Sequence, residues 1–102
     1  MGYKPKIAHP KKREFFVTTP IYYINSAPSV GSAYTTIIAD TLARWHRLKG
    51  DSVFFLTGLD ENSVKTVQAS KQAGFDDIQK YSDSMAEKWV LAWKKLDIGY
   101  DD

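Results

Sequence analysis

Residues 14–57, EFFVTTPIYYINSAPSVGSAYTTIIADTLARWHRLKGDSVFFLT, decide the fold of this chain. Phe15–Thr19 is aromatic and β-branched, which is typical of a buried strand, and we expect Pro20 to end it. A helix is predicted from about residue 33 to 49, and Ser52–Thr57 predicts a second strand. Strand, helix and strand in this order predict an α/β fold that starts with a right-handed βαβ unit and parallel strands.

The predicted helix has an apolar face. Its apolar residues recur every three or four positions and therefore share one side of the helix. They are Tyr34, Ile37, Ile38, Leu42, Trp45 and Leu48. Arg44, Arg47 and Lys49 suit the negative end of the helix dipole, and Gly50 suits the left-handed position that follows.

The rest of the chain predicts a loop and two further helices. A loop is expected over residues 58–62, a helix over 63–73 that stops at Gly74, and a third helix capped by Asp76 that runs to about Leu96. The third helix has a stripe at helical spacing, formed by Ile78, Tyr81, Met85, Trp89, Trp93 and Leu96. Core packing explains this stripe better than a cofactor site does.

Length and composition exclude several classes of protein. The 102 residues suit one small domain, which we place at residues 15–102. The chain has no cysteine, so disulfides, thiolate metal sites and cysteine nucleophiles are excluded. No apolar run approaches membrane-spanning length, and no secretory signal is evident, so we expect a cytoplasmic protein.

The basic charge is concentrated in residues 1–14, which carry a net charge of +4, whereas the remainder carries −2. Pro5 and Pro10 disfavour regular structure there. We expect a flexible, solvated tail, and the alternative is a weak contact with a nucleic-acid backbone.

A ligand site is expected at the carboxyl ends of the two strands, where open α/β sheets bind ligands. The loops at residues 20–32 and 58–62 both lie at that edge. The helix start offers free N–H groups, and Gly31 would let a nucleotide approach the backbone. Asp60 and Glu61 could hold an amine or a hydroxyl. The pattern indicates nucleotide binding, although it is neither G-x-G-x-x-G nor a Walker loop.

The segment FFVTTPIYYINSAPSVGSAYTTIIADTLARWHRLKGDSVFFLTGLDEN closely resembles the amino-terminal part of bacterial methionyl-tRNA synthetases. The resemblance runs from Phe15 to the last residues. It implies a class I synthetase with a Rossmann-type catalytic domain. Such enzymes join methionine to ATP as methionyl-adenylate and then transfer the methionyl group to tRNA.

The resemblance also assigns roles to individual residues. It places Ile21 and Tyr23 along the methionine side chain and Asp60 against the methionine ammonium. An apolar wall suits a thioether, and a carboxylate suits a cation.

On the nucleotide side, the resemblance places Val30 and Gly31 near adenine and ribose. The two histidines of the family signature, which act on the α-phosphate of ATP, fall on Ser29 and Ser32. Mg²⁺ is expected to arrive with ATP, and no metal is expected to bind to this segment itself.

Several positions depart from the family pattern. A serine hydroxyl is shorter than an imidazole and carries no charge, so Ser29 and Ser32 provide a weakened phosphate contact at most. Alternatively, Ser29 is a turn residue and Ser32 an N-cap of the helix. Leu59, Asn62 and Ser63 also replace the usual residues of the second loop.

The two histidines of this chain lie elsewhere. His46 is expected to be a structural or surface residue, and His9 has no metal-binding partner in the tail.

The family's KMSKS loop, connective insertion and anticodon-binding domain do not occur in these 102 residues. Three interpretations therefore remain: an amino-terminal piece of a synthetase, one half of a split synthetase, and a non-enzymatic binding module that kept the fold. The expected ligands are methionine and ATP, with tRNA bound only by the complete enzyme. The incomplete sheet further predicts self-association or binding to a remaining synthetase segment.

Overall fold

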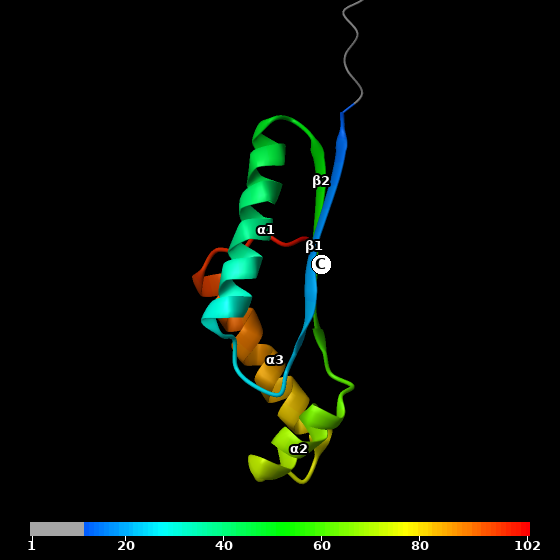
Figure 1. Cartoon of the computed structure of the whole chain (residues 1–102), viewed down its shortest axis with the longest axis vertical. Coiled ribbons are helices and arrows are strands. Elements are labelled where there is room, and N and C mark those ends of the chain that lie inside the picture. Colours follow the sequence, from blue (N-terminus) through cyan, green and yellow to red (C-terminus); the bar gives the residue numbers. More distant parts are fainter. Residues whose placement is uncertain (1–11) are drawn as a thin grey trace, which may run out of the picture.

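The computed structural model describes residues 12–102, which form an α/β unit built on two strands. Its elements are β1 (Glu14–Tyr23), α1 (Val30–Leu48), β2 (Ser52–Asp60), α2 (Val64–Gln72) and α3 (Ile78–Lys95) (Figure 1). The strands pair in parallel, as predicted from the sequence. The expected tail lies mostly outside the described residues, although Glu14 already belongs to β1.

Pro20 does not end the first strand as expected. β1 continues to Tyr23 because the ladder absorbs the proline in a bulge. Thr18 lies opposite Leu56 and Ile21 opposite Gly58, so β1 advances by one residue more than β2. A proline is tolerated at a bulge because its missing N–H removes no regular ladder bond there.

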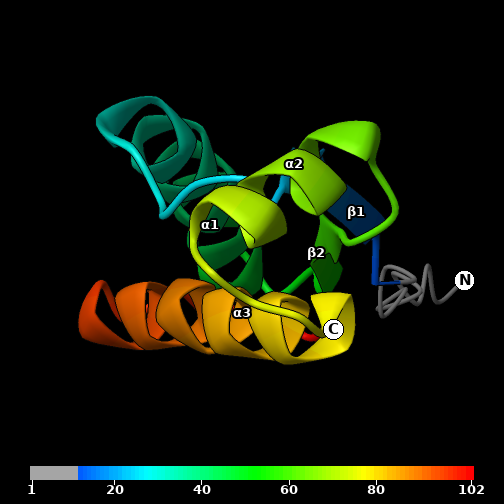
Figure 2. The same ribbon diagram turned by 90° about the horizontal axis from the view of Figure 1, so that it is seen from below.

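Both long helices pack against the same face of this sheet. Phe55 is fully buried against Ala39 and Ala43 of α1. Further along, Tyr22 stacks on Trp89 of α3, with ring centroids 5.1 Å apart. Figure 2 shows α3 on the side of β2 rather than of β1. The α3 stripe is therefore core packing, as predicted, and its buried members are Tyr81, Met85, Trp89 and Trp93.

The opposite face of the sheet is bare. Its large apolar side chains are all partly exposed, from 36% for Leu56 to 65% for Ile21. Phe16 and Phe54 stack on each other across the strands, with ring centroids 5.8 Å apart. No helix of the described residues covers these rings.

The apolar face predicted for α1 also points away from the core. Its six residues are between 42% and 84% exposed. The helix instead packs through smaller side chains, namely Thr36, Ala39, Asp40 and Ala43. Small residues allow the helix to lie close to the strands, and the larger apolar residues remain on the outer side.

The helix ends follow the capping rules, with small shifts from the predictions. α1 begins at Val30, and its N-cap is Ser29 rather than Ser32. Gly50 adopts the left-handed conformation after this helix, with φ of 87°, as predicted. Asp77, one residue later than expected, caps α3. No helix in residues 12–102 is long and apolar enough to cross a membrane.

Residues 97–102 pass beside the middle of α1 and return to β2 (Figure 1). The Asp40 carboxylate accepts hydrogen bonds from the Gly99 N–H and from the Arg44 guanidinium, both over 2.8 Å. The hydrogen bond between Arg44 and Asp40, together with the negative charge of Asp40, raises the pKa of Arg44. The C-terminal segment is consequently tied to both α1 and the sheet.

Candidate functional site at the carboxyl end of the strands

The three residues predicted to hold the amino acid lie together on the bare face of the sheet. Tyr23 lies opposite Asp60 in the strand register, and Ile21 lies two residues before Tyr23 on the same face. Ile21 is 65% exposed and Tyr23 is 53% exposed, so both side chains are accessible. An aromatic ring, an aliphatic group and a carboxylate thus share one surface.

The bulge at Pro20 selects which tyrosine reaches this surface. Successive residues of a strand point to opposite faces, and one extra residue inverts the alternation. In a regular strand of the same sequence, Tyr22 would lie opposite Asp60. With the bulge, Tyr22 turns into the core and Tyr23 faces solvent.

Asp60 is part of β2 and not of a loop, which corrects the prediction for residues 58–60. Its Oδ1 accepts a hydrogen bond from the N–H of Asn62 over 3.0 Å. Lys65, near the start of α2, places its Nζ 6.0 Å from the centre of the Tyr23 ring. The carboxylate therefore sits on a strand end that is fixed by the following turn.

The two serines of the turn form a reciprocal capping box. The Ser29 hydroxyl accepts from the Ser32 N–H over 3.3 Å, and the Ser32 hydroxyl accepts from the Ser29 N–H over 2.9 Å. The Ser32 hydroxyl also donates to the Ser29 carbonyl over 3.0 Å. Both serines therefore take part in capping the helix, and Ser29, not Ser32 as predicted, is the N-cap residue.

Val30 and Gly31 are the first two residues of α1, and their N–H groups lie before the helical hydrogen-bond ladder begins. A Cβ atom added to Gly31 would meet the Ser29 hydroxyl at 3.7 Å, an ordinary contact. The chain itself therefore does not require a glycine here.

Sequence reasoning missed the groups that hold the turn in place. The Tyr22 hydroxyl bonds to the Thr36 hydroxyl over 2.8 Å and to the Ser32 carbonyl over 3.3 Å. From α3, Tyr81 donates to the Ile24 carbonyl and Trp89 to the Ser26 carbonyl. The signal was the residue type, because tyrosine and tryptophan carry a polar atom that needs a partner when they are buried.

His46 is a structural residue, as expected. Its Nδ1 lies 2.6 Å from Oδ2 of Asp51, and its ring stacks on Phe15 with centroids 3.5 Å apart. His9 lies outside the described residues. Within residues 12–102, no group of three His, Asp or Glu side chains could hold a metal ion.

The helix start and the strand ends lie at the same end of the molecule, as Figure 1 shows. Comparison with known proteins identifies this arrangement. The sequence profile of the family described as tRNA synthetases class I (M) matches residues 15–102. The chain belongs to this family.

Relatives of this synthetase segment are methionine–tRNA ligases. The ligase of Thermotoga maritima is 54% identical over 88 residues, and that of Fusobacterium nucleatum is 50% identical over 91 residues. These matches cover 86% and 89% of this chain but only 14% of each relative. The chain corresponds to the amino-terminal segment of their catalytic domain.

Solved structures support the same assignment. Methionyl-tRNA synthetase of Mycobacterium tuberculosis, in complex with methionyl-adenylate, matches with a TM-score of 0.84 at 37% identity. That match covers 88% of this chain and 18% of the solved chain. A leucyl enzyme, LeuRS of Agrobacterium radiobacter, matches with a TM-score of 0.83 at 22% identity, which shows a shared fold.

Proposed function

We propose that this segment contributes the methionine-binding surface and part of the ATP site for methionyl-adenylate formation in a methionine–tRNA ligase. The observation that carries the proposal is the register of the strands, which brings Ile21, Tyr23 and Asp60 onto one accessible surface. Transfer of the methionyl group to tRNA requires the complete enzyme, since this chain spans 14% of such relatives.

On the amino-acid side, the chemistry of the surface suits methionine. Ile21 and the Tyr23 ring offer an apolar wall for the thioether. The Asp60 carboxylate offers a charged acceptor for the ammonium group, and charge-assisted hydrogen bonds are stronger than neutral ones. Since Asp60 and Tyr23 are register partners, both ends of the amino acid can be held at once.

On the nucleotide side, α1 provides attraction for a phosphate. Adenylate formation joins a methionine carboxylate oxygen to the α-phosphorus of ATP and breaks the bond from that phosphorus to the leaving pyrophosphate. The free N–H groups and the dipole of α1 favour an anion at the helix start.

The serines contribute little to the rate of this step. Ser29 and Ser32 are uncharged, and their hydroxyls are engaged in the capping box. Binding that is equal in the ground state and the transition state does not accelerate the reaction. A single well-placed donor is worth about 3 kcal/mol in the transition state, and this turn supplies no charged one.

A second candidate function is a binding module without catalysis. The capping box favours it, because the two signature positions serve the stability of the helix start. Under this alternative the segment retains affinity for methionine or ATP, and no adenylate forms even in the context of a complete synthetase.

A chimaera tests these alternatives. In the Thermotoga maritima ligase, residues 15–102 of this chain replace the matched segment, and methionine-dependent exchange of pyrophosphate into ATP is measured. We expect slow but measurable exchange by the chimaera and negligible exchange by this chain alone. Histidines introduced by Ser29→His and Ser32→His should speed the chimaera and leave the short chain unchanged, because both halves of the site act on one transition state.

The Asp60→Asn variant of the chimaera should raise the KM for methionine, whereas the exposed carboxylate control Asp76→Asn should leave it unchanged. Robust exchange by the unmodified chain alone would reject the proposal that the serine turn is a poor catalyst. Binding of methionine without any exchange by the chimaera would favour the binding module.

A further inference from the structure

Two side chains of α3 hold the backbone of the turn between β1 and α1. The Tyr81 hydroxyl donates to the Ile24 carbonyl over 3.0 Å, and the Trp89 indole N–H donates to the Ser26 carbonyl over 3.1 Å. These donors lie 57 and 63 residues further along the chain than their acceptors. The backbone on either side of Asn25 is therefore fixed by tertiary structure and not by the turn itself.

Aromatic packing makes both donors rigid. The Tyr22 ring stacks on Trp89 with centroids 5.1 Å apart, and Trp93 meets the Trp89 ring edge-on at 5.5 Å. Phe75 packs edge-on against Tyr81, with centroids 5.6 Å apart. A side chain whose rotamer is locked by packing keeps its donor in one place, so α3 offers the turn a rigid support.

The turn has few other ties. Among the hydrogen bonds within residues 12–102, only the bond from Trp89 reaches residues 25–28. The next residue, Ser29, is the N-cap of α1, and it accepts hydrogen bonds from the N–H groups of Ser32 and Ala33. A turn that moves would carry its N-cap away from these groups and fray the helix start.

The two halves of the proposed site therefore differ in how they are fixed. Ile21, Tyr23 and Asp60 belong to paired strands, and the ladder holds them. Val30 and Gly31, on the nucleotide side, follow the sparsely tied turn. A site loses affinity in proportion to the fraction of molecules that leave its competent conformation. Loosening of the turn should thus weaken nucleotide binding and leave methionine binding intact.

We propose that Tyr81 and Trp89 are positioning residues for the nucleotide half of the site. They act through the backbone of residues 24–26, which sets the N-cap and the first N–H groups of α1. This role rests on the proposed function, because ATP is the ligand that the helix start would receive.

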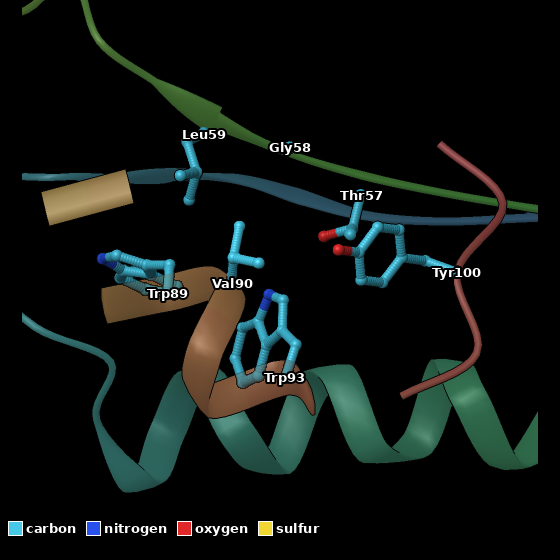
Figure 3. A pocket seen from close by; sticks show the side chains of 7 residues that line it. All are labelled: Thr57, Gly58, Leu59, Trp89, Val90, Trp93 and Tyr100. Carbon is cyan, nitrogen blue, oxygen red and sulfur yellow. The ribbon is translucent and has the colours of Figure 1, made fainter. Parts of the chain in front are cut away.

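Removal of the indole N–H tests this role with little change of shape. Benzothienylalanine is tryptophan with a sulfur atom in place of that N–H, so it keeps the fused rings and loses the donor. One version of the chain carries it in place of Trp89, and a control carries it in place of Trp93. Both indoles line the same apolar cavity of about 110 Å³, as Figure 3 shows, but only Trp89 bonds to the turn.

Amide hydrogen exchange of the 102-residue chain, followed by NMR, reports on the turn without any ligand. We expect the Ser32 and Ala33 N–H groups to exchange about fivefold faster with the analogue at Trp89, the effect of one lost hydrogen bond. Amides in the β1–β2 ladder should keep their rates, and the control at Trp93 should change none. Unchanged exchange at the helix start would overturn the proposal. Equally faster exchange throughout the chain would do the same, because it would show a purely structural role.

Ligand binding is measured in the chimaera with the Thermotoga maritima ligase, as dissociation constants that require no turnover. Tyr81→Phe, which keeps the ring, and the analogue at Trp89 should each raise the Kd of ATP about fivefold. The Kd of methionine should stay nearly constant. Tyr100→Phe, a matched loss of a hydroxyl away from the turn, should change neither constant.

The two dissociation constants separate positioning from general destabilisation. A rise in both, or in neither, would show that the turn does not serve the nucleotide half selectively, and the proposed role would be wrong. ATP binding that depends on Trp89 in a chimaera without pyrophosphate exchange would support the positioning role. That outcome would contradict only the catalytic part of the proposed function.

Discussion

The hydroxyl of Tyr22 lies 2.8 Å from the hydroxyl of Thr36, and this contact joins the end of β1 to the first turns of α1. Thr36 is completely buried, and its hydroxyl also donates to the Ser32 carbonyl over 2.8 Å. β1, which carries the proposed amino-acid surface, and α1, whose first turn is the proposed phosphate site, are therefore held together by one small polar cluster.

Removal of the Tyr22 hydroxyl should loosen this junction. Tyr22→Phe deletes one partner of a buried hydroxyl, and we expect it to lower the free energy of unfolding by about 1 kcal/mol. Urea denaturation measures the change. The matched control is Tyr23→Phe, whose ring is on the exposed face and which should be nearly neutral. Equal effects of the two substitutions would contradict the role given to Tyr22.

The capping box should be measurable as helix stability. Ser29→Ala removes the N-cap acceptor of α1, and we expect a loss of about 1 kcal/mol, or a fall in Tm of about 4–8 °C for a domain of this size. Thermal unfolding followed by circular dichroism reports the change. Ser52→Ala, at an exposed serine of β2, is the control and should leave Tm nearly unchanged. An unchanged Tm for Ser29→Ala would remove the capping role.

Burial raises the pKa of Tyr81 above its usual value near 10. Since the folded state holds this proton more tightly than the unfolded state, its contribution to stability is complete below pH 10 and is lost as the pH rises through the folded pKa. We expect the free energy of unfolding to fall as the pH rises above about 10, and less steeply in Tyr81→Phe. Denaturation series at several pH values test this, with Tyr23→Phe as a control for loss of a tyrosine. A slope unchanged in Tyr81→Phe would show that other groups cause it.

The exposed apolar face of α1 should promote association. Leu42 and Leu48 are 43% and 84% exposed on that face. Exposed apolar patches favour contact with other proteins, so we expect concentration-dependent self-association or partner binding. The double substitution Leu42→Lys and Leu48→Lys should suppress it in light scattering, whereas Thr41→Lys, also on the exterior of α1, should not. A parent chain that stays monomeric at all concentrations would contradict this prediction.

Local patterns predicted the elements because local physics forms them. The parallel strands and the core stripe of α3 followed from strand-forming residues and helical spacing, and Gly50 and Gly74 marked helix ends through their positive φ. The positions of Ile21, Tyr23 and Asp60 on one face required the register, which is a property of two strands and cannot be seen in either alone.

Other features depended on tertiary packing. The apolar face of α1 predicted a buried side, yet small residues such as Ala39 and Ala43 pack on the sheet. Burial depends on which surfaces a fold brings together, and hydrophobic spacing shows only that a face exists. The N-cap of α1 was predicted at Ser32 and is Ser29. Two serines three residues apart can both bond to the backbone at the helix start, so the path of the preceding loop decides which of them is the N-cap.

The bulge at Pro20 also has a consequence for chain length. Between the ladder pairs on either side of the bulge, β1 has two residues and β2 has one, so one residue of β1 has no partner in β2. A deletion of Pro20 would join Thr19 directly to Ile21, and every residue before and after would keep its partner and its face. Deletion of Val17, by contrast, would displace all the residues before it. Among single-residue deletions in β1, the loss of the proline is therefore the one that we expect this fold to accept.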